Sequence, residues 1–260
     1  MALSVYADVI FEPLLEVDAQ LLDDHHPATV AFRRAGGEGP VWLRSSIPIG
    51  RGMGFSGAAR VGGVVAAHAQ RYGTDPDRLE QALPELLHLA TELEGHADNV
   101  AASLYGGVVA TAAGHAVRVP LALEPAMVLW VPSSATSTDD SRRGLPASVP
   151  FADAVHNIGR TALLVAALAA GDIGALRAAT EDRIHQDLRL AHAEPSRAAL
   201  LAALDAGAWA AWLSGSGPSV AVMCAVDEAD AIAAALPSEG HSKLLRIDRR
   251  GALMLQRRDD

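Results

Sequence analysis

Apolar positions recur along the chain in two patterns, and together they predict a mixed α+β protein. Alternating apolar and polar residues predict a strand within residues 1–17, and the apolar run at 41–49 predicts a second strand. Leucines and alanines at steps of three and four predict a core-facing helix over 77–94, with Pro84 as an alternative start. The chain therefore combines half-buried strands with amphipathic helices.

The same two patterns, alternation for strands and steps of three or four residues for helices, predict the remaining elements. A glycine cluster at 50–57 opens into a helix over 58–72, and a short helix follows His96 and ends at Gly106. Further predicted helices cover 154–170, 173–182, 196–206 and 228–236, and further strands cover 108–112, 126–131, 209–213, 219–226, 244–247 and 252–256. We place one domain boundary near 121–125, which gives an N-terminal domain over 1–124 and a C-terminal domain over 125–260.

Charge and composition narrow the classes of partner and compartment. The formal net charge is −10 and no Lys/Arg run is present, so a nucleic-acid partner is not expected. No stretch approaches the roughly 20 apolar residues of a membrane span, and no basic, then apolar leader opens the chain. The lone cysteine, Cys224, lies in an apolar run that predicts a buried strand. We expect a cytoplasmic protein with no membrane or nucleic-acid partner.

The glycine cluster Gly52-Met53-Gly54-Phe55-Ser56-Gly57 is the first candidate site. A glycine-rich turn at a helix N-terminus presents backbone N–H groups and the positive end of the helix dipole, which suits a phosphate. The spacing also matches a dinucleotide fingerprint, but no strand precedes the acidic residues Asp75 and Asp77. A P-loop is excluded because no Gly-Lys-Ser/Thr follows. A glycine-rich connection without a ligand remains the third interpretation.

Three segments in order resemble the GHMP kinases, a family that includes galactokinase, homoserine kinase, mevalonate kinase and phosphomevalonate kinase. Residues 48–59 (PIGRGMGFSGAA) resemble the ATP-binding motif PxxxGLGSSAA, and residues 214–219 (SGSGPS) resemble the C-terminal loop SGSGPT that supports the nucleotide loop. Residues 92–100 (ELEGHADNV) resemble the EGHPDN signature of the homoserine kinases in particular. The three segments span most of the chain.

The resemblance implies a fold, an activity and two cofactors. The implied fold is a two-domain GHMP kinase fold, with an N-terminal domain like ribosomal protein S5 domain 2 and a ferredoxin-like C-terminal domain. The implied activity is ATP-dependent phosphorylation of the L-homoserine hydroxyl to O-phospho-L-homoserine, a step of threonine biosynthesis, with Mg²⁺ as metal. A GHMP kinase for another small alcohol and a catalytically impaired nucleotide-binding homologue are the alternatives. The oligomeric state stays open, with a homodimer as one option.

The resemblance also assigns site residues. The ATP-binding residues are Pro48, Gly50, Arg51, Gly52, Met53, Gly54, Phe55, Ser56, Gly57, Ala58 and Thr138. The metal ligands are Ser56 and Glu92, with Glu94 as the alternative, because Mg²⁺ prefers hard oxygen ligands. The substrate and catalytic residues are Glu92, His96, Asp98, Arg160 and Arg189, the two guanidinium groups being suited to a substrate carboxylate. No general base is assigned.

Two features depart from the family pattern. The family's first motif, PxSSANLGPGFD, and its strand are absent, because Met1 stands at the stretch that follows them, so we expect a chain cut short at its start. In the ATP loop, Phe55 replaces the first serine of a Ser-Ser pair and Gly57 replaces an alanine. Phe55 brings a bulky ring to a position where a small polar group would face the phosphates.

Overall fold

The computed structural model describes residues 1–12, 18–133 and 145–255. Its backbone contacts divide the chain into two compact units. Unit 1 comprises Met1–Pro48, Gly54–Arg118 and the segment from Asp248 onward, and unit 2 comprises Ile49–Met53 and Val119–Ile247. The chain thus passes from unit 2 back to unit 1 between Met53 and Gly54, inside the glycine cluster. The predicted boundary at residue 124 stays a prediction.

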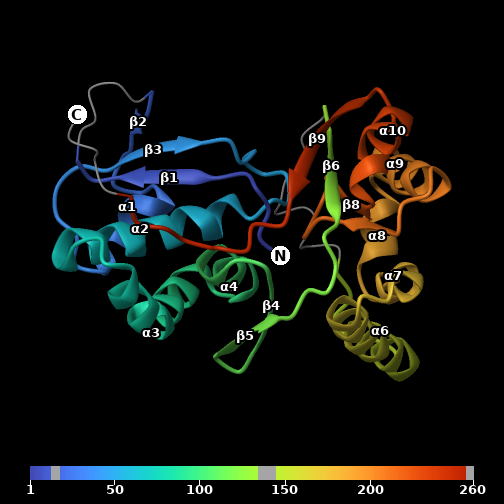
Figure 1. Ribbon diagram of the computed structural model, residues 1–260, viewed down its shortest axis with the longest axis horizontal. Helices are drawn as coiled ribbons and strands as arrows, with labels where there is room; N and C mark the ends of the chain where they lie inside the picture. Colours follow the sequence, from blue (N-terminus) through green and yellow to red (C-terminus); the bar gives the residue numbers. More distant parts are fainter. Residues whose placement is uncertain (13–17, 134–144, 256–260) are drawn as a thin grey trace. The chain divides into compact units, whose positions relative to one another are not determined.

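Unit 1 contains a small antiparallel sheet covered by two helices. Strands β1 (Ala7–Ile10), β3 (Trp42–Ser45) and β2 (Gln20–Leu21) lie in the order β1-β3-β2. Helices α1 (Pro27–Arg34) and α2 (Phe55–Tyr72) pack on each other, and α2 lies along β1 (Figure 1). The 18 residues of α2 are rich in Ala, Gly and Val, which allows this close approach of backbones.

The rest of unit 1 comprises two further helices, which pack against α2, and a hairpin that packs against the second of them. Helix α3 (Pro76–Glu94) is capped by Asp75, whose side chain accepts from the Asp77 N–H at 3.0 Å, and Gly95 ends it in a left-handed conformation. Helix α4 (Asp98–Tyr105) and the hairpin of β4 (Val108–Ala112) and β5 (His115–Val119) follow. The core joins these helices through the fully buried residues Val64, Ala90, Val100 and Leu104.

Unit 2 is a four-stranded antiparallel sheet with helices packed against it. Strands β7 (Ala210–Leu213), β8 (Val220–Cys224), β6 (Ala126–Pro132) and β9 (Gly240–Arg246) lie in the order β7-β8-β6-β9. Every residue of β6 is buried, as expected for an uninterrupted apolar run in a central strand. The connectivity is β-α-β-β-α-β, the ferredoxin-like arrangement.

The helices of unit 2 fall into two groups along the chain. Between β6 and β7 the chain forms α6 (Phe151–Ala170), α7 (Ile173–Ala179), α8 (Gln186–Leu190) and α9 (Glu194–Asp205). Between β8 and β9 it forms the 3₁₀ turn η1 (Val226–Glu228) and α10 (Ala229–Ala235). Helices α9 and α10 lie together on one side of the sheet, and the core beneath them is centred on Trp130 and Val222 (Figure 1).

Several predicted elements are confirmed and several are wrong. The strand predicted within 1–17 is only four residues long, and α1, β5 and α8 were not predicted. The predicted strand at 252–256 is absent from its described residues, because the Ala252 N–H donates to Leu104 O at 3.1 Å in place of a sheet partner. Pro84 lies inside α3, which already begins at Pro76, so Pro84 does not mark the helix start. Among the described helices, none is both long and apolar enough to span a bilayer.

Candidate active site

The first half of the glycine cluster is fixed within unit 2 by the loop at 214–218. Gly52 has φ 71°, and its carbonyl oxygen accepts a hydrogen bond from Ser214 Oγ at 2.9 Å. A Cβ atom at Gly52 would overlap Ser214 O and lie 2.7 Å from Gly217 O. Arg51 Nη1 donates to Pro132 O at 2.6 Å, at the end of β6. The turn therefore requires glycine both for its conformation and for its close packing.

The second half of the cluster belongs to unit 1 and opens α2. Gly54 is the N-cap residue, with φ 69°, and no side chain of the described residues is recorded as capping the helix start. No acidic residue lies in that turn either. The first N–H groups of an 18-residue helix are therefore available to an anion at the positive end of its dipole. Asn99 lies against this turn, since a Cβ at Gly54 would be 3.0 Å from its Cγ.

Phe55 packs against a side chain of unit 1. Its ring lies edge-on to His26, with centroids 6.0 Å apart and an interplanar angle of 84°. Burial lowers the pKa of His26, while the nearby Asp23 acts in the opposite direction, and a neutral imidazole is a good partner for an aromatic edge. This packing gives the bulky residue a structural role in unit 1 that the motif comparison does not reveal.

Ser56 and Glu94 form the polar centre of unit 1. Ser56 Oγ donates to Glu94 Oε2 at 2.9 Å, which links the first turn of α2 to the last residue of α3. Arg60, one turn after Ser56, directs its Nη1 to both Ser56 Oγ and Glu94 Oε2. The Glu94 side chain is only 9% exposed and the Arg60 side chain 20%. A carboxylate so deeply buried requires a cationic partner.

Glu92, our first choice of metal ligand, lies elsewhere. Its side chain is 55% exposed and Oε1 is 3.4 Å from His88 Nε2, a neighbour on α3. Residues two apart on a helix do not share a face, because each residue turns the helix by about 100°. The structure therefore places Glu94, the alternative, beside Ser56, and corrects the pairing of Ser56 with Glu92.

His96 and Asp98 lie next to Glu94 and extend the group of polar side chains. His96 Nδ1 lies 2.5 Å from Asp98 Oδ1, and its Nε2 lies 3.9 Å from Glu94 Oε1. Asp98 Oδ1 also accepts from the Asn99 N–H at 2.7 Å. The segment 94–99 thus gathers two carboxylates and an imidazole within unit 1.

The donor set around Ser56 fits Mg²⁺ in chemistry. A hydroxyl and a buried carboxylate are hard oxygen donors, and Mg²⁺ bound with a nucleotide takes its other ligands from water and phosphates. Among the described residues no cluster of three or more His, Cys, Asp or Glu residues could hold a metal by itself. A magnesium ion here would therefore depend on a nucleotide for much of its coordination.

Arg160 and Arg189 lie in unit 2 on different helices. Arg160, on α6, pairs with Glu181, its Nη2 being 2.7 Å from Oε2. Arg189, on α8, donates from Nη1 to Gly215 O at 3.1 Å, in the loop that contacts Gly52. Arg189 and the turn at Gly52 thus contact the same loop within unit 2.

Asp182 and Asn157 hold the segments that carry the two arginines, and neither was predicted as a site residue. Asp182 Oδ1 accepts from the N–H groups of Ile184 (2.6 Å), His185 (2.7 Å) and Gln186 (3.2 Å). Asn157 Nδ2 donates to Asp182 Oδ2 at 3.2 Å, which ties α6 to the start of α8. An acidic residue just before a short polar helix is the sequence signal that could have identified it.

The surroundings of Asp182, between α6 and the start of α8, favour an ionised Asp182 and a neutral His185. Burial raises the pKa of Asp182, but the three backbone donors and His185 outweigh it, so the pKa lies below its ordinary value. Burial lowers the pKa of His185, with Asp182 opposing and Arg189 adding to the effect. The carboxylate therefore keeps its acceptor role across the physiological pH range.

The remaining predicted ATP-binding residues that the structure describes lie just before the glycine turn, within it, or in the first turn of α2. Gly50 is exposed, and Pro48, Met53 and Ala58 are half-buried. Gly57 is buried against Asn99, which explains its small size. Thr138 lies outside the described residues. Cys224 is fully buried in β8, and burial together with Glu228 raises the pKa of its thiol to about 11, so it has no part in this chemistry.

Comparison with known families and proteins agrees with this arrangement. The profile described as "GHMP kinases N terminal domain" matches residues 22–107, and that described as "GHMP kinases C terminal" matches residues 164–242. The chain belongs to the GHMP kinase family. The expected two-part α+β fold of that family is thereby confirmed.

Relatives in this family extend over most of the chain. The homoserine kinase of Streptomyces coelicolor is 42% identical over 213 residues, which are 80% of this chain and 67% of that protein. A homoserine kinase of Thermus thermophilus is 37% identical in an alignment of 268 positions, which covers 95% of this chain and 89% of that protein. The similarity thus spans both units.

Solved GHMP kinase structures share the fold. The homoserine kinase of Cytophaga hutchinsonii superimposes with a TM-score of 0.76 at 26% identity, covering 88% of this chain and 78% of that one. The mevalonate kinase of L. major, solved with R-mevalonate, gives a TM-score of 0.68 at 18% identity over 96% of this chain and 89% of that one. The second likeness concerns the fold alone.

Proposed function

We propose that the chain is a homoserine kinase, which transfers the γ-phosphate of ATP to the hydroxyl of L-homoserine and yields O-phospho-L-homoserine and ADP. The observation that carries the proposal is the segment 94–99, where Glu94 meets Ser56 and His96 meets Asp98. Curated relatives up to 43% identical are named homoserine kinase, which supports the same substrate.

The nucleotide is assigned to the glycine cluster and the start of α2. Backbone N–H groups of residues 52–57 would bind the phosphate oxygens, because the uncapped helix start offers free donors. Ser56 and Glu94 would hold Mg²⁺ through oxygen atoms. When bound, the metal supplies positive charge to the phosphate oxygens during transfer.

The acceptor is assigned to charged side chains, of which Arg160 and Arg189 lie in unit 2. Arg160 and Arg189 would bind the homoserine carboxylate, since a guanidinium group forms two parallel hydrogen bonds with a carboxylate. Asp98 would bind the ammonium group, and His96 would orient near the hydroxyl. Phosphoryl transfer relies mainly on positioning and charge, so no general base is assigned.

A nucleotide-binding homologue without turnover is the second candidate. It is favoured by one observation: the Arg60 guanidinium contacts Ser56 Oγ and Glu94 Oε2, the two oxygen atoms that we assign to the metal. We further propose a cytoplasmic location and a small-molecule substrate, with no nucleic-acid or membrane partner. The oligomeric state stays open, with a homodimer as one option, and size-exclusion chromatography decides it.

A coupled ADP-release assay with L-homoserine, mevalonate and galactose separates these candidates. The proposal expects turnover with homoserine at a kcat/KM at least about tenfold above the other two, in line with a site that binds an amino acid by charge. Turnover of mevalonate or galactose in preference would support a different GHMP kinase. Thermal stabilisation by ATP without turnover of any acceptor would support the inert homologue.

A further inference from the structure

Arg60 occupies the position expected of a metal ion. Its Nη1 contacts both Ser56 Oγ and Glu94 Oε2, the two oxygen atoms that the proposed function assigns to Mg²⁺. Residues four apart on a helix share a face, so the side chain of Arg60 extends back toward the start of α2. The protein thus places a positive charge of its own between the two donors.

The contacts of Arg60 are few and confined to this position. Among the described residues its one carboxylate partner is Glu94, and its buried Nε has no hydrogen-bond partner. A buried polar group without a partner raises the free energy of the conformation that contains it. This arrangement leaves the guanidinium free to exchange its place for another cation without breaking a second ion pair.

We propose that Arg60 is a built-in competitor for the divalent cation and must move out of the Ser56–Glu94 pair before the metal binds. The inference rests on the proposed assignment of those two oxygens to Mg²⁺. A guanidinium and a divalent ion cannot share the same two oxygens, because like charges repel strongly at such short distances. Arg60 therefore weakens metal binding in the absence of nucleotide and keeps Glu94 paired.

Mn²⁺ binding, followed by electron paramagnetic resonance on the full chain without ATP, tests the inference. Arg60→Met should lower the Kd for Mn²⁺ at least about tenfold relative to the wild type, since it removes a competing charge. Arg60→Lys should stay within a few-fold of the wild type, because a cation remains. Arg33→Met, which breaks the surface ion pair with Asp24, is the matched control and should leave the Kd unchanged.

The outcomes separate this inference from the proposed function. Unchanged or weaker Mn²⁺ binding in a folded Arg60→Met variant, as judged by its melting curve, overturns the competition. If Arg60→Met does not fold, the same comparison is made with Arg60→Gln, which is similar in length. Homoserine turnover by the wild type is measured in parallel. If the wild type turns over homoserine but Arg60→Met leaves the Mn²⁺ Kd unchanged, the inference alone is overturned. If Arg60→Met binds Mn²⁺ more tightly but the wild type shows no turnover, the proposed function alone is overturned.

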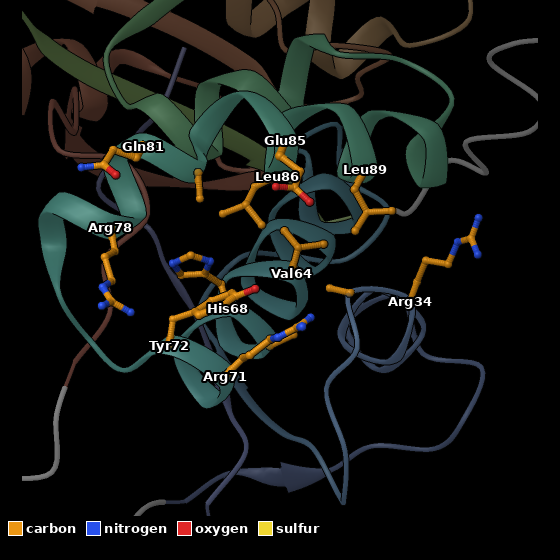
Figure 2. A pocket seen from close by; sticks show the side chains of 13 residues that line it. Arg34, Val64, His68, Arg71, Tyr72, Arg78, Gln81, Glu85, Leu86 and Leu89 are labelled. Atoms are coloured by element: carbon orange, nitrogen blue, oxygen red, sulfur yellow. The ribbon is translucent and has the colours of Figure 1, made fainter.

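A second, independent observation concerns a cavity at the other end of α2. It has a volume of about 420 Å³, lies within unit 1 between α2, α3 and the end of α1, and falls within the size range of small-ligand sites. Val64, Leu86 and Leu89 form apolar walls (Figure 2). The figure shows the His68 and Tyr72 rings close to each other among the lining side chains, and their centroids are 5.0 Å apart.

The lining is cationic although the chain is acidic. Arg34, Arg71 and Arg78 line the cavity against the single carboxylate Glu85, in a protein of formal net charge −10. Arg71 stacks on Tyr72 at 5.2 Å from the ring centroid. Among the described residues, neither Arg34 nor Arg71 has a carboxylate partner within 4.0 Å, so their charges are open to an anion.

His68 adds a polar atom to the wall. Its Nε2 is buried and has no hydrogen-bond partner among the described residues. Burial lowers the pKa of His68, with Glu85 opposing and Arg78 adding to the effect, so the ring is neutral at physiological pH. An unsatisfied buried nitrogen gains a hydrogen bond when a polar ligand enters.

The geometry points to a binding site for a small organic anion whose carboxylate or phosphate oxygens contact the arginines while its apolar part lies against Val64, Leu86 and Leu89. Arginine forks suit both kinds of oxyanion. The site is separate from the Ser56–Glu94 pair, which lies at the first turn of α2, whereas this cavity lies along the C-terminal half of that helix.

Binding is tested by nitrogen-15 NMR of the His68 imidazole during titration with benzoate, inorganic phosphate and benzylamine, without ATP. Benzoate or phosphate should shift the His68 signals with a Kd in the millimolar range or below, and benzylamine, the cationic match of benzoate, should not. The Arg34→Met/Arg71→Met double variant should weaken the binding at least about tenfold, equivalent to one charge-assisted contact. Arg33→Met is the surface control.

Either of two results overturns the anion site. One is the absence of any His68 shift with both anions. The other is a shift that the double variant leaves unchanged or that benzylamine reproduces. Binding of benzoate alone identifies a carboxylate ligand, and binding of phosphate alone identifies a phosphate ligand. Both confirm the proposal, and neither depends on kinase activity.

Discussion

Ser56 Oγ lies 2.9 Å from Glu94 Oε2, although 38 residues separate them in the sequence. The bond joins the first turn of α2 to the C-terminal end of α3, where Gly95 stops the helix in a left-handed conformation. Glu94 reaches Ser56 because it is the last residue of α3, whereas Glu92 points to another side of the same helix. The choice between Glu94 and Glu92 follows from helix geometry.

The two glutamates should differ sharply on substitution. Glu94→Gln should lower kcat on the order of 100-fold, the usual effect of losing a preorganised electrostatic contact, and raise the Mg²⁺ concentration required for half activity. Glu92→Gln should leave both values within about twofold, because its side chain is exposed and, in the part of the chain that the structure describes, pairs with His88 alone. Steady-state rates over a Mg²⁺ titration measure both. Equal losses in the two variants contradict the assignment.

Gly52→Ala should disrupt the loop more than Gly50→Ala. Both residues have positive φ, but a Cβ at Gly52 would overlap Ser214 O, whereas no atom of the described residues lies within 4 Å of a Cβ at Gly50. Gly50→Ala should therefore cost only the backbone strain, about 1 kcal/mol of the free energy of unfolding, and Gly52→Ala at least about 1–3 kcal/mol. Urea unfolding measures the difference, and equal costs would mean that the close packing on the 214–218 loop is absent.

Asp182→Ala should destabilise the protein and impair homoserine binding together. Losing the acceptor of three partly buried N–H bonds should lower the free energy of unfolding by about 1–3 kcal/mol, and the KM for homoserine should rise as α8 loosens. Asp187→Ala, an exposed residue of the same helix, is the control. A destabilised variant with an unchanged KM would show that Asp182 does not position the arginines.

The contribution of Asp182 to the free energy of unfolding should depend on pH. The pKa of Asp182 in the folded protein lies below its ordinary value of 3.8, so the unfolded chain takes up the proton first as the pH falls. The contribution of Asp182 is therefore fully present above pH 3.8 and is lost as the pH falls below it. The difference between wild type and Asp182→Ala should narrow in acid urea titrations, and a constant difference down to about pH 3 would contradict this origin.

Arg189→Lys should raise the KM for homoserine by roughly tenfold with little change in the KM for ATP, because lysine keeps the charge but loses the fork that binds a carboxylate bidentately. Arg177→Lys, at an exposed position on α7, is the matched control. A rise in the ATP KM alone would place Arg189 with the nucleotide.

The sequence predicts the long helices and strands better than the short elements that polar side chains hold in place. Long periodic segments such as α3 and the apolar run of β6 follow directly from their spacing. Helix α8 was missed because its five residues carry no period, and it forms because Asp182 accepts its first N–H groups. Local hydrogen bonds of this kind depend on the tertiary fold rather than on propensity.

The candidate site shows the same division. The motifs locate the glycine turn and the segment 94–99, since their residues are contiguous. They could not place Arg60 on the Ser56–Glu94 pair or Phe55 on His26, because these contacts join residues of different elements or different turns. Sequence patterns locate the contiguous motifs, and the structure adds the contacts of Arg60 and Phe55.

The most direct test of the account is ³¹P NMR of the purified protein incubated with ATP, Mg²⁺ and L-homoserine. The account predicts the appearance of a phosphomonoester signal, identified as O-phospho-L-homoserine, in step with ADP formation, and its loss in the Glu94→Gln variant. ADP formation without the phosphomonoester, or none at all from folded protein that binds ATP, would contradict it.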